Sequence, residues 1–193
     1  MHKVLRILIL SDLFIIGSFG LVQPIFAVYM IQNVVGISLT AIGIATTIQL
    51  VTKAIMQIIV AKWTDEEPGN RRELATLLIG SVLMSLVSFG YIWVHNLSML
   101  YVLQFLYGLG GALAFPGWVV IYSRYIRAEK AGYEWSVYST IVSLGTATAA
   151  AIGGYMAEAY SFTHLFVVIG TLSLIGSSFI SYIFKQEFTK QNP

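Results

Sequence analysis

Apolar stretches of about twenty residues follow one another along almost all of this 193-residue chain, and most charged residues fall in the short gaps between them. An α-helix rises about 1.5 Å per residue, so roughly 20 apolar residues cross the hydrocarbon core of a bilayer. The pattern predicts an all-α, multi-pass membrane protein in which residues 1–193 form a single domain. We expect six transmembrane helices, at residues 7–31, 40–61, 74–95, 99–122, 137–159 and 165–184.

Composition argues against other classes of protein. Charged residues make up 10% of the chain, whereas soluble domains carry about 25%. There is no cysteine, so disulfides and thiolate catalysis are excluded. His2, His95 and His164 have no acidic partner at metal-ligand spacing, and no catalytic triad or phosphate-binding glycine loop can be assembled. We therefore expect no enzyme activity, no cofactor, no metal and no nucleic-acid partner.

The basic residues indicate the orientation in the membrane. The gaps at 32–39, 95–98 and 158–164 contain no lysine or arginine, whereas both ends of the chain and the other two gaps do. Loops on the cytoplasmic side carry the excess of basic residues. The pattern predicts that both termini lie in the cytoplasm, and we expect the plasma (inner) membrane as the location.

Two charged residues lie inside predicted spans, Asp12 in the first and Lys53 in the second. Charges within a membrane are costly and usually face a partner or a water-filled cavity. Counted from the nearest polar ends, the two residues sit at comparable depth. A structural ion pair and a coupling or substrate-binding site both fit this placement. For the second case we predict that Asp12 is the proton-responsive group and Lys53 its electrostatic partner.

Glutamines lie on the same helix faces as these two charged residues, so each of the two spans carries a row of polar side chains along one face. Gln49 and Gln57 share one face of the second span with Lys53, and Gln23 lies about three helical turns beyond Asp12 on the same face of the first span. The rows indicate faces turned toward water or a solute. Hydrogen bonding between neighbouring helices is the alternative, because buried amides often join membrane helices.

The loop after the second span carries a motif. The stretch from Ala61 through Asp65 and Gly69 to Arg71-Arg72 resembles the loop between the second and third helices of the major facilitator superfamily, Gly-x-Leu-Ala-Asp-x-x-Gly-Arg-Arg/Lys. The chain departs from this pattern at Ala61, Trp63 and Asn70, and by one residue inserted between Asp65 and Gly69.

Three other stretches share the likeness to this family. Residues 104–111 resemble its fourth-helix motif, with Gln104 where many proton-coupled members have arginine, and residues 149–154 resemble the end of the fifth-helix motif of antiporters. Residues 20–24 fit its first helix. Positions that favour helix bending or close packing are Gly20, Pro24, Gly108, Gly111, Pro116, Gly153 and Gly154.

The resemblance implies a secondary active transporter that moves a small solute across the bilayer by alternating access, with proton-coupled efflux as a candidate mode. It implies that the first and fourth helices line a central cavity, and that the loop motif at Asp65, Gly69, Arg71 and Arg72 locks one conformation. Wall residues of the cavity would be Gln104, Tyr107, Phe115 and Trp118. Two alternatives remain. In the first, the four wall residues only pack against neighbouring helices; in the second, the charges of the loop only set the orientation of the chain in the membrane.

Length sets this chain apart, because members of the family typically have twelve spans. The chain resembles an amino-terminal half, a bundle of 3+3 helices. An even number of spans returns the chain to its starting side, so two such bodies can pair about an axis along the membrane normal. We expect a homodimer or a second six-helix half as partner. Three alternatives stay open: a fragment of a twelve-helix transporter, a six-helix carrier that acts alone, and a non-transporting interaction or assembly protein.

Overall fold

The computed structural model of the chain describes residues 2–66 and 71–191. Within these residues six helical spans are long and apolar enough to cross a membrane, which confirms the all-α, six-span expectation. They run over Lys3–Asn33, Leu39–Asp65, Arg71–Trp93, Leu97–Tyr125, Ala128–Ala159 and Phe162–Lys185.

The first span is not a single helix. Helix α1 covers Lys3–Gly20, a 3₁₀ turn (η1) covers Gln23–Ile25, and α2 covers Phe26–Asn33. Pro24 has no backbone N–H, so the carbonyl four residues earlier loses its helical partner, and proline also disfavours helical geometry in the residue before it. Pro24 thus removes one helical hydrogen bond at the place where the span is interrupted.

The other spans are nearly continuous helices. Their bounds are α3 at Leu39–Asp65, α4 at Arg71–Gly90 followed by a 3₁₀ turn (η2) at Tyr91–Trp93, α5 at Leu97–Tyr125, a 3₁₀ turn (η3) at Ala128–Lys130, α6 at Ala131–Ala159, and α7 at Phe162–Gln191. Side-chain caps fix two of the starts. Ser38 Oγ accepts from the backbone N–H of Ala41 at 3.1 Å, and Asn96 Oδ1 accepts from that of Met99 at 2.9 Å.

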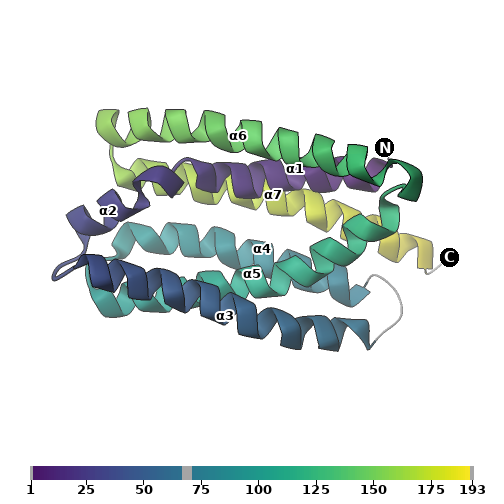
Figure 1. Cartoon of the computed structure of the whole chain (residues 1–193), viewed down its shortest axis with the longest axis horizontal. Coiled ribbons are helices and arrows are strands. Elements are labelled where there is room, and N and C mark those ends of the chain that lie inside the picture. The colour runs from purple at the N-terminus through teal and green to yellow at the C-terminus, as the bar shows by residue number, and fades with distance from the viewer. Residues whose placement is uncertain (1, 67–70, 192–193) are drawn as a thin grey trace.

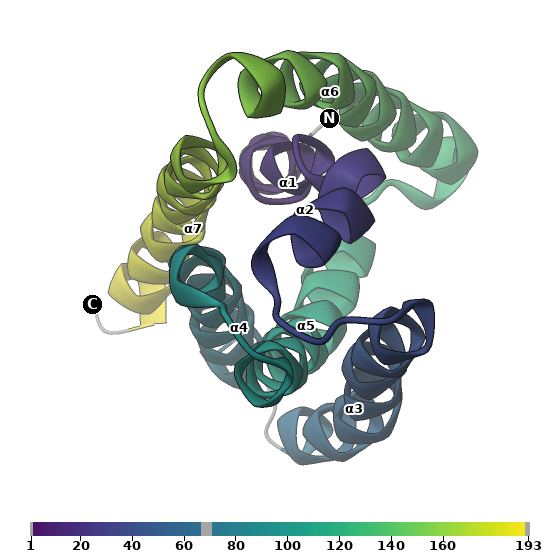
Figure 2. The same cartoon turned by 90° about the vertical axis from the view of Figure 1, so that its left-hand side faces the viewer.

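The helices form two packed groups that are not consecutive in sequence. Helix α5 packs against α3 and α4, α1 packs against α6 and α7, and contacts between α4 and α7 join the groups. Figure 1 shows both chain termini at one end of the bundle, here called the terminal end; the opposite end is the far end. Figure 2 shows α3 and α6 at the periphery, on either side of α1, α2 and α5.

Glycines allow two of these contacts to be backbone to backbone. A Cβ atom at Gly108 would lie 2.4 Å from the backbone oxygen of Gln49, and one at Gly153 would lie 1.8 Å from that of Leu21. Helix α5 therefore approaches α3, and α6 approaches the end of α1, at distances that no larger residue permits. Gly154, by contrast, has nothing within 4 Å of its Cβ position.

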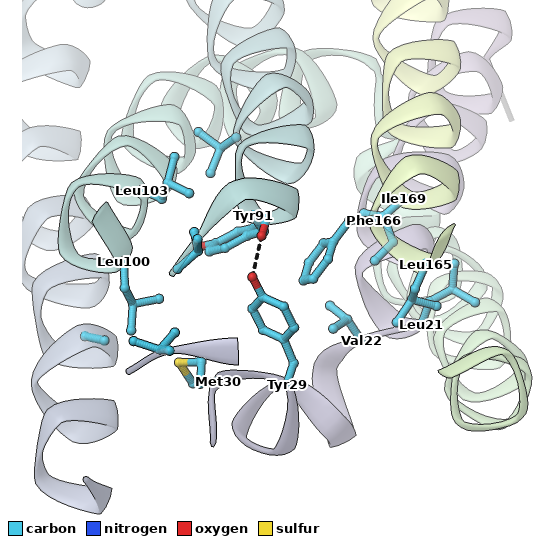
Figure 3. Close-up of a cluster of buried hydrophobic side chains, with 14 residues drawn as sticks. Leu21, Val22, Tyr29, Met30, Tyr91, Leu100, Leu103, Leu165, Phe166 and Ile169 are labelled. Carbon is cyan, nitrogen blue, oxygen red and sulfur yellow. Dashed lines mark hydrogen bonds between the residues drawn. The ribbon is translucent and has the colours of Figure 1, made fainter. Parts of the chain in front are cut away.

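Aromatic side chains hold the far end together (Figure 3). The Tyr29 hydroxyl on α2 donates to the backbone carbonyl of Tyr91, which lies where α4 gives way to the η2 turn. The ring of Phe166 on α7 packs edge-on against Tyr29, with centroids 4.7 Å apart. Three segments distant in sequence thus meet in one buried cluster. A second buried cluster, which includes Leu5, Leu74 and Ile180, fills the terminal end.

Candidate functional site

A cavity of about 380 Å³ lies between the two buried clusters, and we call it the charged lobe. Asp12 of α1 and Lys53 of α3 both line it, so the two charges expected at comparable depth share one space. The remaining walls come from α1, α3, α4, α5 and α6: Ile15, Ile16, Phe19, Gln49, Leu77, Ser81, Met84, Tyr107, Gly108, Gly111, Ala114, Phe115, Trp118 and Tyr138.

An adjoining cavity of about 430 Å³, the amide lobe, is nearer the far end. Its polar lining comes from Gln23 at the break in the first span, Thr46 and Gln49 on α3, and Gln104 on α5. Its other lining residues are Ile16, Phe19, Val22, Phe26, Tyr91, Tyr107 and Phe166. The lobes share Ile16, Phe19, Gln49 and Tyr107.

An aromatic pair stands where the lobes meet. The rings of Phe19 on α1 and Tyr107 on α5 pack edge to face, with centroids 4.8 Å apart and an interplanar angle of 62°. Helices α1 and α5 otherwise make few direct contacts. The pair therefore bridges the two helices across the space that the lobes occupy.

Asp12 is buried and receives a hydrogen bond from another helix. Its side chain is 7% exposed, and the Tyr138 hydroxyl on α6 donates to Oδ2 at 2.9 Å. Trp118 also lies beside the carboxyl group, but its buried indole N–H makes no hydrogen bond of normal geometry to a described residue. The hydrogen bond from Tyr138 thus links the carboxyl group of Asp12 on α1 to α6.

Lys53 has a different environment. Its Nζ lies 5.1 Å from the centroid of the Phe115 ring, and its stem runs beside Gly111. Among the described residues no hydrogen-bond acceptor or carboxylate pairs with this ammonium group. The structural ion pair with Asp12 that the sequence left open is therefore absent from this conformation.

Four aromatic rings back the Asp12 side of the charged lobe. Trp118 and Tyr122 on α5 stack at 4.8 Å, and both contact Trp135 and Tyr138 on α6. The Tyr122 hydroxyl donates to the backbone carbonyl of Glu134 at 3.0 Å. This packing fixes the ring of Tyr138 and so the position of its hydroxyl group.

Two buried glutamates fasten the terminal end. Glu134, 1% exposed, accepts from Arg127 through the side chain at 2.7 Å and from its backbone N–H at 3.1 Å. Glu73, 2% exposed, pairs with Arg124 at 3.2 Å. From the sequence, the charged residues of these segments serve only to assign the orientation in the membrane, so neither ion pair is predicted. Their position in the first turn of a helix, where a carboxylate is favoured, is the signal that could have found them.

Of the nine residues predicted for coupling or solute binding, eight line the lobes and one, Gln57, does not. Gln57 lies one turn beyond Lys53 on α3 but lines neither lobe. Gln23 and Gln104 are in the amide lobe alone. Pro116 is buried within α5, which continues through it as one helix. The predicted residues that line the charged lobe are Asp12, Gln49, Lys53, Tyr107, Gly108, Gly111, Phe115 and Trp118.

The loop motif is described only in part, because Gly69 lies outside the described residues. Asp65 ends α3 and is exposed, and Arg71 begins α4. The Arg72 guanidinium lies 4.8 Å from the ring centroid of Trp63 and donates to the Trp63 carbonyl at 2.8 Å. Arg72 thus joins α4 to the end of α3.

The sequence model of the Major Facilitator Superfamily matches residues 8–193. The matched region includes the whole of both lobes and the loop between α3 and α4.

Proposed function

The chain belongs to the major facilitator superfamily of membrane transporters, and we propose that it forms one six-helix half of a secondary active transporter that moves a small solute by alternating access. The two adjoining lobes between α1, α3 and α5 carry this proposal. A space with charged, amide and aromatic walls, in the middle of an otherwise apolar bundle, is what a polar solute needs to cross a membrane.

Asp12 is the proposed site of coupling to protons. It is an acidic side chain on the wall of the charged lobe, and its hydrogen bond from Tyr138 ties its charge state to the position of α6. Protonation changes what this carboxyl group offers to Tyr138, so it can favour one arrangement of α1 and α6 over another. Outward movement of the solute against proton entry is the mode we propose.

A second six-helix body completes the proposed transporter. Helices α3 and α6 carry large exposed apolar side chains, among them Ile58, 70% exposed, and Leu144, 64% exposed. These helices border α1 and α5, which line the lobes. A second copy of the chain, or a different half, placed against α3 and α6 would enclose the lobes on the open side.

The proposed orientation has both termini in the cytoplasm, in the plasma (inner) membrane. The basic residues support it, because Arg71, Arg72, Arg124 and Arg127 all belong to the terminal end of the bundle.

Reconstituted protein tests the transport proposal. Purified chain in liposomes that contain a pH-sensitive dye is given an imposed proton gradient and a panel of small organic anions, cations and neutral solutes. Solute-dependent proton flux is expected. Asp12→Asn should abolish the flux while solute exchange without a gradient persists. Proton-driven flux that survives in Asp12→Asn would refute the coupling role, and a folded protein that moves no solute would favour an interaction or assembly protein.

A further inference from the structure

The two charged residues of the charged lobe, Asp12 and Lys53, differ in their polar partners. Asp12 already has a donor from Tyr138 at 2.9 Å, with the indole of Trp118 beside it. Lys53 has the face of Phe115 but no oxygen acceptor among the described residues. An ammonium group carries three donors and no acceptor. The partner that the lobe lacks is therefore an acceptor at Lys53, and a negatively charged one fits best.

The walls around Lys53 indicate what the rest of such a ligand would be. Phe19, Tyr107 and Phe115 present rings to the same space, and Gln49 lies one helical turn from Lys53. The volume, about 380 Å³, is at the lower end of the range for small-molecule sites. A single acidic group on a compact aromatic or aliphatic body matches this combination of one cation, one amide and apolar rings.

We propose that the charged lobe binds a small organic carboxylate, whose acidic group pairs with Lys53 and whose apolar body packs between Phe19, Tyr107 and Phe115. This inference rests on the proposed transport function, for which it names the class of solute. Binding places the carboxylate in the same lobe as Asp12, so an ionised Asp12 repels the ligand and a protonated Asp12 does not.

The binding of the carboxylate is thereby linked to protons. The titratable and charged groups that line the lobe are Asp12 of α1, Lys53 of α3, Tyr107 of α5 and Tyr138 of α6, and the lining residues from α4 carry no charge. Asp12 is the one carboxylic acid among these four. Benzoate affinity should therefore fall as the pH rises through the range in which Asp12 ionises, and Asp12→Asn should remove that dependence.

Three probes of one shape and different charge test the proposal: benzoate, benzyl alcohol and benzylammonium. Their dissociation constants are measured by calorimetry on the full chain in lipid nanodiscs. Benzoate should bind most tightly. Lys53→Met should weaken benzoate binding by about tenfold or more, as expected for the loss of a charge pair, and Lys53→Arg should restore most of it. Lys62→Met, the same change at an exposed position of α3, is the matched control and should have no effect.

Each contrary result overturns a defined part of the proposal. Tighter binding of benzylammonium, lost in Asp12→Asn, would make the lobe a cation site. Folded protein that does not bind benzoate, or that binds it equally well in Lys53→Met, would refute the carboxylate site. Benzoate binding without transport would support the carboxylate site and contradict the transporter proposal. Proton-coupled movement of a cation would support the transporter proposal and contradict the carboxylate site.

Discussion

At the scale of single residues, the hydrogen bond from Tyr138 to Asp12 is the contact on which the proposed coupling depends. It joins two side chains 126 positions apart and links α6 to α1 at the wall of the charged lobe. A hydrogen bond to a charged group contributes roughly 1.5 to 3 kcal/mol, which is enough to shift a balance between two conformations. Tyr138 is thus as important to the proposed coupling as Asp12 itself.

Tyr138→Phe removes the donor and keeps the ring in its aromatic cluster. We expect the pH profile of proton-coupled transport to shift and the maximal rate to fall by about tenfold, in line with the loss of one such hydrogen bond. Benzoate affinity measured where Asp12 is protonated should change little. Tyr155→Phe is the control, because Tyr155 lies on the same helix and is 67% exposed. A pH profile identical to that of the unmodified protein would show that Tyr138 does not hold the acid.

The sequence placed Asp12 and Lys53 together because depth along two adjacent spans can be counted. It missed Tyr138 because a tyrosine in an apolar span carries no signal of its own. The spacings of Trp118 to Tyr122 and of Trp135 to Tyr138 are both those of one helix face, and these pairs point to the aromatic cluster. No pattern in the sequence shows that the cluster sits behind Asp12.

At the scale of helices, close backbone contacts hold α5 against α3 on one side of the lobes. The contact at Gly108 places two helix backbones too near for a side chain. The lobes take their shape from this approach, since Gly108 and Gly111 line the charged lobe on the same helix that carries Phe115. Stability and cavity shape therefore depend on the same glycines.

Gly108→Ala should destabilise the protein, because the added Cβ meets the Gln49 carbonyl at 2.4 Å and forces the helices apart. Overpacking of this kind costs about 1 to 3 kcal/mol. Gly43→Ala on α3 is the matched control. With nothing within 4 Å of its Cβ position, it should leave stability unchanged or raise it by up to about 1 kcal/mol, as alanine favours helix over glycine. Unfolding in mild detergent measures both, and equal shifts would contradict the close contact.

The loop between α3 and α4 supports a separate prediction. Asp65 is exposed at the end of α3, so its charge is available to a second helical body. Asp65→Asn should alter the transport rate or the balance between access states and leave solute affinity nearly unchanged. Glu129→Gln, at an exposed position in the turn between α5 and α6, is the control for simple loss of charge. A large loss of affinity with an unchanged conformational balance would show that Asp65 acts at the solute site.

Hydropathy was sufficient to predict the six spans, but it did not predict where the helices begin, end or break. Helix α6 starts at Ala131, six residues before the predicted span, because the helix continues into polar sequence held by the Glu134–Arg127 pair. The first span breaks beyond Gly20 at Pro24, which the sequence marked only as a candidate for bending. The packing of α5 between α3 and α4 depends on contacts between distant residues, which span boundaries do not encode.

At the scale of the whole molecule, the most exposed helices flank the lobes. Helix α3 packs mainly on α5, and α6 mainly on α1, so each leaves a broad apolar surface uncovered. Lipid can cover an apolar surface, but it cannot satisfy the polar lining of the lobes. The position of these two helices beside the lobes, rather than behind them, favours a second helical body on that side.

Because the chain has no cysteine, introduced cysteines can report on this arrangement directly. Ile58→Cys on α3 combined with Leu144→Cys on α6 should give a cross-linked product of two copies of this chain in native membranes. Ile79→Cys on α4, 59% exposed, lies on a helix outside the proposed interface and should not cross-link. A protein that stays monomeric in nanodiscs and still transports would instead be a six-helix carrier that acts alone.

The interruption of the first span divides it into two helical segments, α1 and α2. Pro24 deprives the Gly20 carbonyl of its helical donor, and Gln23 at the same place lines the amide lobe. We therefore predict that the break is a hinge. On this prediction, α2 tilts with the far-end cluster and changes the amide lobe while Asp12 stays in place on α1. Amide hydrogens around residues 21–26 should then exchange with deuterium well before those of α1, and uniform protection across the span would show that it moves as one rod.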